Sequence, residues 1–183
     1  SKLNKIQNQL DGGLGFVLLR NLPVEYFNDE EVKFMLWGIG QHIGYPEVQD
    51  KAGSLIHVVT DTGSSVNKTD NIRGFQTNEE LQFHTDGADV FALLCLRNAK
   101  SGGLSKLVSS VAIFNEIEKI RPDLSEVLQE DFYFDTRAQN PNEEKIQKVP
   151  IFVKHNNLVS ALHKRRYIET AQRFSDVPDL TLN

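Results

Sequence analysis

The 183-residue sequence has one cysteine, no long hydrophobic run and no excess of basic residues. A single cysteine cannot form an internal disulfide, so nothing indicates an oxidising compartment. The longest apolar run, residues 90–96, is far shorter than the roughly 20 residues that span a bilayer, and the N-terminal stretch lacks a signal-peptide core. The formal net charge of −5 argues against nucleic acid or an anionic membrane as the main partner. These absences predict a cytoplasmic protein and leave its oligomeric state open.

The composition is that of an ordinary globular domain with a real core, since 39% of residues are apolar and 25% are charged. No internal repeat and no low-complexity segment interrupts the chain, so we expect a single domain over residues 1–183. Cys95 lies inside the apolar run, where we expect a small buried thiol.

Hydrophobic periodicity and turn residues predict helices interspersed among about seven short strands. The expected helices are 3–10, 28–38, 110–120 and 122–129, and the expected strands are 15–20, 55–60, 90–96, 104–109, 131–135, 149–154 and 158–162. Polar loops are expected at 61–71, around 140–141 and over 175–183. This order favours a mixed α+β fold, a distorted double-stranded β-helix (jelly roll) with helices packed outside. A parallel doubly wound sheet is the alternative, but the glycines at 12–15 precede their strand instead of following one.

The chemistry lies in the tripeptide His84-Thr85-Asp86, just before the apolar run. Side chains alternate between the faces of an extended segment, so His84 and Asp86 point the same way and Thr85 points oppositely. An imidazole and a carboxylate without thiolates suit a borderline divalent metal, and two histidines with one carboxylate typify non-heme Fe(II) oxygenases. The tripeptide supplies two of those three ligands.

The residues around this tripeptide resemble the taurine dioxygenase family of Fe(II)- and 2-oxoglutarate-dependent oxygenases. The resemblance runs from about Gly15 to Asp179 and includes the segments GFVLLRNLP, VTDTG, RGFQTN, HTDGADVFALLCLRNAKSGGLS and RRYIETAQRF. It implies that His84 and Asp86 bind Fe(II), and that Ser105, after Gly102-Gly103, donates a hydrogen bond to 2-oxoglutarate. It also implies oxidation of an unactivated C–H bond of a small molecule, such as an amino acid or amine, by O2, with release of succinate and CO2.

The resemblance further implies a distal histidine and a cosubstrate-binding arginine downstream of the RRYIETAQRF segment. We expect both beyond Asn183, and therefore a domain that lacks its C-terminal part in this chain. His155 is the alternative third ligand, because it is followed by Arg165 and Arg166 at a spacing that related oxygenases accept, although its sequence context is a hairpin tip. His163 and His42 have less in their favour.

Two stretches are candidates for contact with substrate. Phe75, Gln76 and Thr77 lie just upstream of His84, and loops on a rigid scaffold commonly select substrates; loop packing is their alternative role. The family resemblance also implies that Arg166 lines the pocket and meets a substrate carboxylate. It belongs to the tight basic cluster 164–166, whose alternative interpretation is a solvated loop or helix end.

Two other function classes remain open at this stage. The chain could be a non-catalytic jelly-roll binding module that retains the tripeptide, in which case the full-length protein would bind no metal. It could also be a Zn(II) hydrolase that uses His84 and Asp86, in which case zinc would restore activity.

Overall fold

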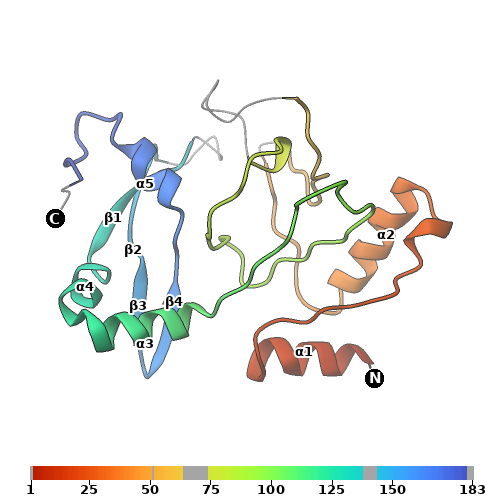
Figure 1. The fold of residues 1–183 in the computed structure, drawn as a ribbon, viewed down its shortest axis with the longest axis horizontal. Helices are drawn as coiled ribbons and strands as arrows, with labels where there is room; N and C mark the ends of the chain where they lie inside the picture. The colour runs from red at the N-terminus through yellow and green to blue at the C-terminus, as the bar shows by residue number, and fades with distance from the viewer. Residues whose placement is uncertain (1, 51, 64–73, 138–143, 181–183) are drawn as a thin grey trace. The chain divides into compact units, whose positions relative to one another are not determined.

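The computed structural model describes residues 2–50, 52–63, 74–137 and 144–180. Within these ranges the chain forms two compact units, whose helices and strands are labelled in Figure 1. The first unit comprises residues 1–49, 54–56 and 90–104, and the second comprises 50–53, 57–89 and 105–183. Most of the expected loop 61–71 and the Asn140-Pro141 loop lie outside the described residues.

The first unit contains helices α1 (Lys2–Gly12) and α2 (Asp29–Gly40) and the short 3₁₀ helix η1 (Val24–Tyr26). Both predicted helices are therefore confirmed. The start of α2 is a capping box: the Asn28 side chain accepts hydrogen bonds from the Glu30 and Glu31 amides at 3.0 and 3.1 Å, and the Glu31 carboxylate accepts from the Asn28 amide at 2.9 Å. Val32, one turn later, is buried.

Four predicted strands are wrong. Residues 15–20, 55–60, 90–96 and 104–109 carry no strand assignment. The expected buried strand is instead exposed at Phe91 (55%) and Leu93 (70%), and Cys95 is exposed as well. A β-strand requires a neighbouring strand to which its backbone is hydrogen-bonded. Among the described residues, none of these four segments is paired with another strand. Their apolar composition predicts an extended backbone, but it does not predict which other segment would pair with it.

The second unit holds the remaining elements. They are η2 (Gly74–Gln76), α3 (Ser110–Ile120), α4 (Pro122–Val127), β1 (Asp131–Asp135), β2 (Ile146–Pro150), β3 (Phe152–His155), β4 (Leu158–Ala161) and α5 (Arg165–Ala171). The predicted helix at Pro122 and the strand over residues 131–135 are confirmed. The predicted strand 149–154 is divided between β2 and β3 at Ile151.

The four strands form two separate antiparallel pairs, β1 with β2 and β3 with β4. In the first pair Asp131 faces Pro150 and Asp135 faces Ile146. The second pair is a hairpin closed by Asn156 and Asn157, which both have positive φ (49° and 63°), as a tight two-residue turn requires. This turn is the predicted one.

The core of the second unit joins α3, the strands and α5. It consists of Phe114, Phe134, Ile151, Phe152 and Ile168. Figure 1 shows α3 against the β3–β4 hairpin and α5 beside β1. The apolar face expected on α3 is only partly core, because Phe114 is completely buried while Ile120 remains 61% exposed.

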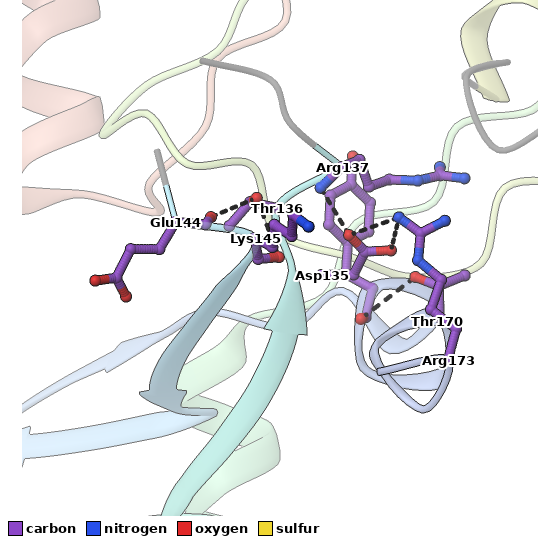
Figure 2. A network of polar contacts seen from close by, with 8 residues as sticks. Asp135, Thr136, Arg137, Glu144, Lys145, Thr170 and Arg173 are labelled. Atoms are coloured by element: carbon purple, nitrogen blue, oxygen red, sulfur yellow. Dashed lines mark hydrogen bonds and ion pairs between the residues drawn. The ribbon is translucent and has the colours of Figure 1, made fainter. Parts of the chain in front are cut away.

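A buried carboxylate ties α5 to β1, as Figure 2 shows. Asp135 ends β1 and is only 1% exposed. Its Oδ1 accepts hydrogen bonds from the Arg137 amide at 2.9 Å and from Nη2 of Arg173, just after α5, at 3.3 Å. Arg173 Nη2 also lies 3.1 Å from Oδ2. The end of α5 is therefore held by an ion pair in addition to the apolar contacts of Ile168 and Ala171.

The described residues thus form a mixed fold of helices and small antiparallel sheets. Fewer strands form in the described ranges than the seven expected, and they do not close into a jelly roll there. No helix in the described part of the chain is long and apolar enough to cross a membrane.

Candidate metal centre

His84 and Asp86 lie in an extended segment of the second unit and face a common point, as the alternation of side chains predicts. The His84 Nε2 and Asp86 Oδ1 atoms are 4.0 Å apart. Both side chains are accessible, at 42% and 48% exposure, whereas Thr85 between them is half-buried. The tripeptide therefore presents two potential ligands on one side and one anchoring residue on the other.

A backbone carbonyl sets the tautomer of His84. The imidazole Nδ1 lies 2.7 Å from the carbonyl oxygen of Gln82. Because a carbonyl oxygen can only accept, Nδ1 must carry the proton, which leaves the lone pair of a neutral ring on Nε2. A hydrogen bond from the second ring nitrogen to a carbonyl is also how proteins orient histidines that bind metals. The nitrogen that faces Asp86 is thus the one able to coordinate.

The two atoms are close to, but wider than, the spacing that one shared ion requires. Two bonds of roughly 2.1 Å at the angles of an octahedral or tetrahedral site place their donor atoms roughly 3.0–3.4 Å apart, whereas Nε2 and Oδ1 are 4.0 Å apart. A neutral imidazole with a carboxylate is nevertheless a donor set suited to Fe(II). These two residues are consequently able to hold a divalent metal.

Thr85 is bonded to His163, which directly precedes the residues that lead into α5. The Thr85 amide donates to the His163 carbonyl at 2.9 Å, and the His163 amide donates to the Thr85 hydroxyl at 2.8 Å. Burial lowers the pKa of the His163 imidazole below its usual value of 6.5; a hydrogen bond to the Phe83 backbone opposes this effect, while the charges of Arg165 and His84 add to it. His163 is thus part of the support of the tripeptide.

The third ligand is not among the described residues as they are arranged, since no three His, Cys, Asp or Glu side chains within them come together as a metal site. His155 ends β3 at the tip of the hairpin, where its Nε2 is 2.9 Å from the Asn156 side-chain amide. This confirms the hairpin-tip interpretation of His155.

Ser105 follows a turn in which Gly102 and Gly103 both have positive φ, a conformation that side chains disfavour. The Ser105 side chain is exposed and forms no hydrogen bond with the described residues. Its expected role toward 2-oxoglutarate therefore stays a prediction.

The candidate substrate residues 75–77 also have structural contacts. Phe75 packs against the His57 ring with centroids 5.0 Å apart, and the Gln76 carbonyl accepts hydrogen bonds from Thr62. The Thr77 hydroxyl donates to the Gly74 carbonyl at 3.0 Å. All three side chains are half-buried, so packing accounts for them and substrate contact stays a prediction.

Arg166 is half-buried in the first turn of α5. Its neighbours in the basic cluster have local partners: Arg165 Nε binds Glu169 at 2.7 Å, and Lys164 Nζ lies 5.2 Å from the centre of the Tyr167 ring. These contacts support the helix-end interpretation for Lys164 and Arg165.

Comparison with known proteins decides the family. The model of the "Taurine catabolism dioxygenase TauD, TfdA family" matches residues 3–180, which is nearly the whole chain. The chain belongs to the TauD/TfdA family. This confirms the resemblance that the segments around His84-Thr85-Asp86 predicted.

Two relatives illustrate the similarity of this TauD/TfdA-family chain. It is 33% identical over 153 residues to "FR-33289 synthase" of Streptomyces rubellomurinus (strain ATCC 31215), which covers 83% of the chain and 45% of that protein. It is 30% identical over 141 residues to "Taurine hydroxylase-like protein SAT17" of Stachybotrys chartarum (strain CBS 109288 / IBT 7711), covering 74% of the chain and 37% of that protein. The chain thus spans less than half the length of each relative.

Two features of the candidate site could not be predicted from the sequence. The Gln82 carbonyl that fixes the His84 tautomer is a backbone group, which no residue type signals. The contact between Thr85 and His163 joins positions 78 residues apart, and no local pattern predicts such a pairing.

Proposed function

We propose that the protein containing this chain is an Fe(II)- and 2-oxoglutarate-dependent dioxygenase that oxidises an unactivated C–H bond of a small molecule. The observation that carries the proposal is the pairing of His84 Nε2 with Asp86 Oδ1 at 4.0 Å, with Nδ1 of the imidazole occupied by Gln82. Membership of the TauD/TfdA family supports the choice of iron over other divalent metals. The name of one relative, a taurine hydroxylase-like protein, favours hydroxylation.

In this proposal the chain contributes two metal ligands and the start of the pocket. His84 and Asp86 hold Fe(II), and Ser105 donates to a carboxylate of 2-oxoglutarate as the family resemblance implies. A hydroxyl orients that carboxylate but carries no charge to neutralise it. The complete domain would be the jelly roll that the family resemblance implies.

Substrate selection is assigned to two places. Phe75, Gln76 and Thr77 precede the tripeptide, and Arg166 is the second residue of α5, three residues after His163. An arginine recognises a carboxylate through two parallel hydrogen bonds, so Arg166 suits a substrate such as an amino acid.

When bound, Fe(II) with 2-oxoglutarate and O2 supplies the oxidising power for C–H oxidation, with release of succinate and CO2. The residues of this chain do the positioning. Gln82 keeps the His84 lone pair on Nε2, and Asp86 supplies a negative charge that favours a divalent cation.

The test compares metal binding and succinate release in the full-length protein. Asp86→Ala removes a proposed ligand, whereas Asp89→Ala makes the same change at an exposed carboxylate three residues away. We expect the wild type and Asp89→Ala to bind Fe(II) and to release succinate in a substrate-dependent manner, and Asp86→Ala to do neither.

Three results would refute the proposal. Unchanged iron affinity in Asp86→Ala would remove the ligand assignment. Activity restored by Zn(II) in place of Fe(II) would indicate a hydrolase. Bound iron without turnover across a broad panel of amines and amino acids would favour a non-catalytic binding module.

A further inference from the structure

The tripeptide His84-Thr85-Asp86 has its own attachment to the second unit, and that attachment runs through Thr85. The Thr85 amide donates to the His163 carbonyl at 2.9 Å, and the Thr85 hydroxyl accepts from the His163 amide at 2.8 Å. In an ordinary antiparallel pair both bonds would be between main-chain groups. Here a side chain provides one of the acceptors, so the attachment depends on the identity of residue 85.

These two bonds restrict both the backbone and the side chain of Thr85. Threonine is stiff at χ1 because it is branched at Cβ, so a hydrogen bond to its hydroxyl also fixes the direction of its Cα–Cβ bond. Neighbouring side chains in an extended segment point to the opposite face. Holding Thr85 against His163 therefore holds His84 and Asp86 toward the other side, where they face each other across 4.0 Å.

His163, to which Thr85 is hydrogen-bonded, is held in position by the helix that follows it. His163 comes two residues before α5, which packs Ile168 into the core of the second unit and buries Ala171 completely. The segment that carries the ligands has little burial of its own, because residues 81–84 and 86–89 are exposed and only Thr85 among 81–89 is half-buried. The hydrogen bonds between Thr85 and His163 thus connect the ligand-bearing segment to the core, together with the hydrogen bond between the His163 imidazole and the Phe83 backbone.

We propose that Thr85 is a positioning residue for the metal centre, whose hydroxyl, held by the His163 amide, fixes the separation of His84 and Asp86. This role rests on the proposed function, since it presupposes that these two side chains bind the metal. Serine retains the hydroxyl that accepts from the His163 amide and should retain most of the role, since it loses only the stiffness at χ1 that the branched Cβ adds. Valine has the same shape without the acceptor and would remove the hydrogen-bond partner of the half-buried His163 amide.

The experiment measures anaerobic Fe(II) affinity of the full-length protein for wild type, Thr85→Ser and Thr85→Val. Loss of a group that orients metal ligands lowers metal affinity about 10- to 100-fold, and we expect this loss for Thr85→Val and near-normal binding for Thr85→Ser. Native-state hydrogen exchange provides a readout without metal: the His163 amide should exchange faster in Thr85→Val than in wild type or Thr85→Ser.

Thr136→Val is the matched control, because the Thr136 hydroxyl forms an equally short bond, 2.8 Å to the Glu144 carbonyl, and bonds to Glu144 and Lys145 instead of to the tripeptide. General destabilisation would lower metal affinity in this variant too, whereas the proposed role predicts no change. If Thr85→Val does not fold, Thr85→Ala and Thr85→Ser make the same comparison, since they differ by one oxygen atom.

The outcomes separate the two proposals. Thr85→Val that binds Fe(II) like the wild type, while Asp86→Ala does not bind, would overturn the positioning role and leave the proposed function standing. An equal loss of affinity in Thr85→Val and Thr136→Val would also overturn it. Unchanged binding in Asp86→Ala would overturn the proposed function, and the positioning role with it.

Discussion

Replacing Asp135 with asparagine tests whether the ion pair between this buried carboxylate and Arg173, shown in Figure 2, stabilises the second unit. The carboxylate is 1% exposed and binds the Arg137 amide at 2.9 Å and Arg173 Nη2 at 3.1 to 3.3 Å. Asparagine keeps an oxygen for the Arg137 amide, but it removes the negative charge opposite Arg173. The change therefore isolates the ionic part of the contact.

The structure sets the size of the expected effect. A hydrogen bond to a charged group contributes about 1.5–3 kcal/mol net. The Arg173 side chain is 42% exposed, so its guanidinium regains water when the carboxylate is lost, which reduces the cost. We expect Asp135→Asn to lower the free energy of unfolding by about 2 kcal/mol, measured by urea denaturation of the full-length protein.

Asp123→Asn is the matched control. Asp123 accepts from Arg121 at 2.9 and 2.7 Å, which are shorter bonds than those from Arg173, but both side chains are largely exposed. Exposed ion pairs contribute little because water screens them, so this variant should unfold like the wild type. Equal effects of Asp123→Asn and Asp135→Asn would refute the reasoning that burial, and not bond length, determines the contribution.

Two further predictions concern the same unit. Phe114→Ala removes a completely buried ring whose centroid lies 5.2 Å from that of Phe152. It should lower the free energy of unfolding, measured by urea denaturation, by about 3–5 kcal/mol. Phe34→Ala, at a 72% exposed position, is the control and should change the free energy of unfolding little. Because the folded-state pKa of His163 lies below its unfolded value near 6.5, the folded state binds fewer protons, so stability should fall as pH falls from that value through the lowered pKa. His163→Gln should flatten this dependence in unfolding curves measured across that range, and an unchanged slope would contradict the assignment.

Local signals in the sequence predicted much of the fold. Asn28 and Glu31 indicated the start of α2, and Pro122 indicated the start of α4, because the groups that cap or begin a helix lie within one turn of it. Asn156 and Asn157 indicated the hairpin for a similar reason, since few residues other than glycine tolerate positive φ. Each of these signals depends only on neighbours in the chain.

The wrong predictions all concern partners distant in the sequence. Residues 90–96 have the composition of a buried strand, yet Leu93 is 70% exposed and the described residues offer this run no ladder. Composition shows that a segment tolerates burial, whereas pairing is decided by which other segment reaches it. The number of strands was overestimated for the same reason.

For the candidate site, the sequence predicted the ligand direction but not its support. The alternation of side chains was sufficient to place His84 and Asp86 on one face. The contact with His163 depends on how residues 163–171 dock against the core, which follows from burial of Ile168 and Ala171 and not from any motif.

The single residue between His84 and Asp86 explains how one short segment can both bind a metal ion and be attached to the rest of the protein. If the histidine and carboxylate were adjacent, they would point to opposite faces and could not share an ion. With Thr85 between them, His84 and Asp86 share one face, and the other face is free for contacts with the protein. Thr85 uses it to bind His163 through its amide and hydroxyl, while Gln82 fixes the imidazole through its carbonyl. Both supports leave Nε2 and the carboxylate oxygens available, so holding the tripeptide in place does not compete with its binding a metal.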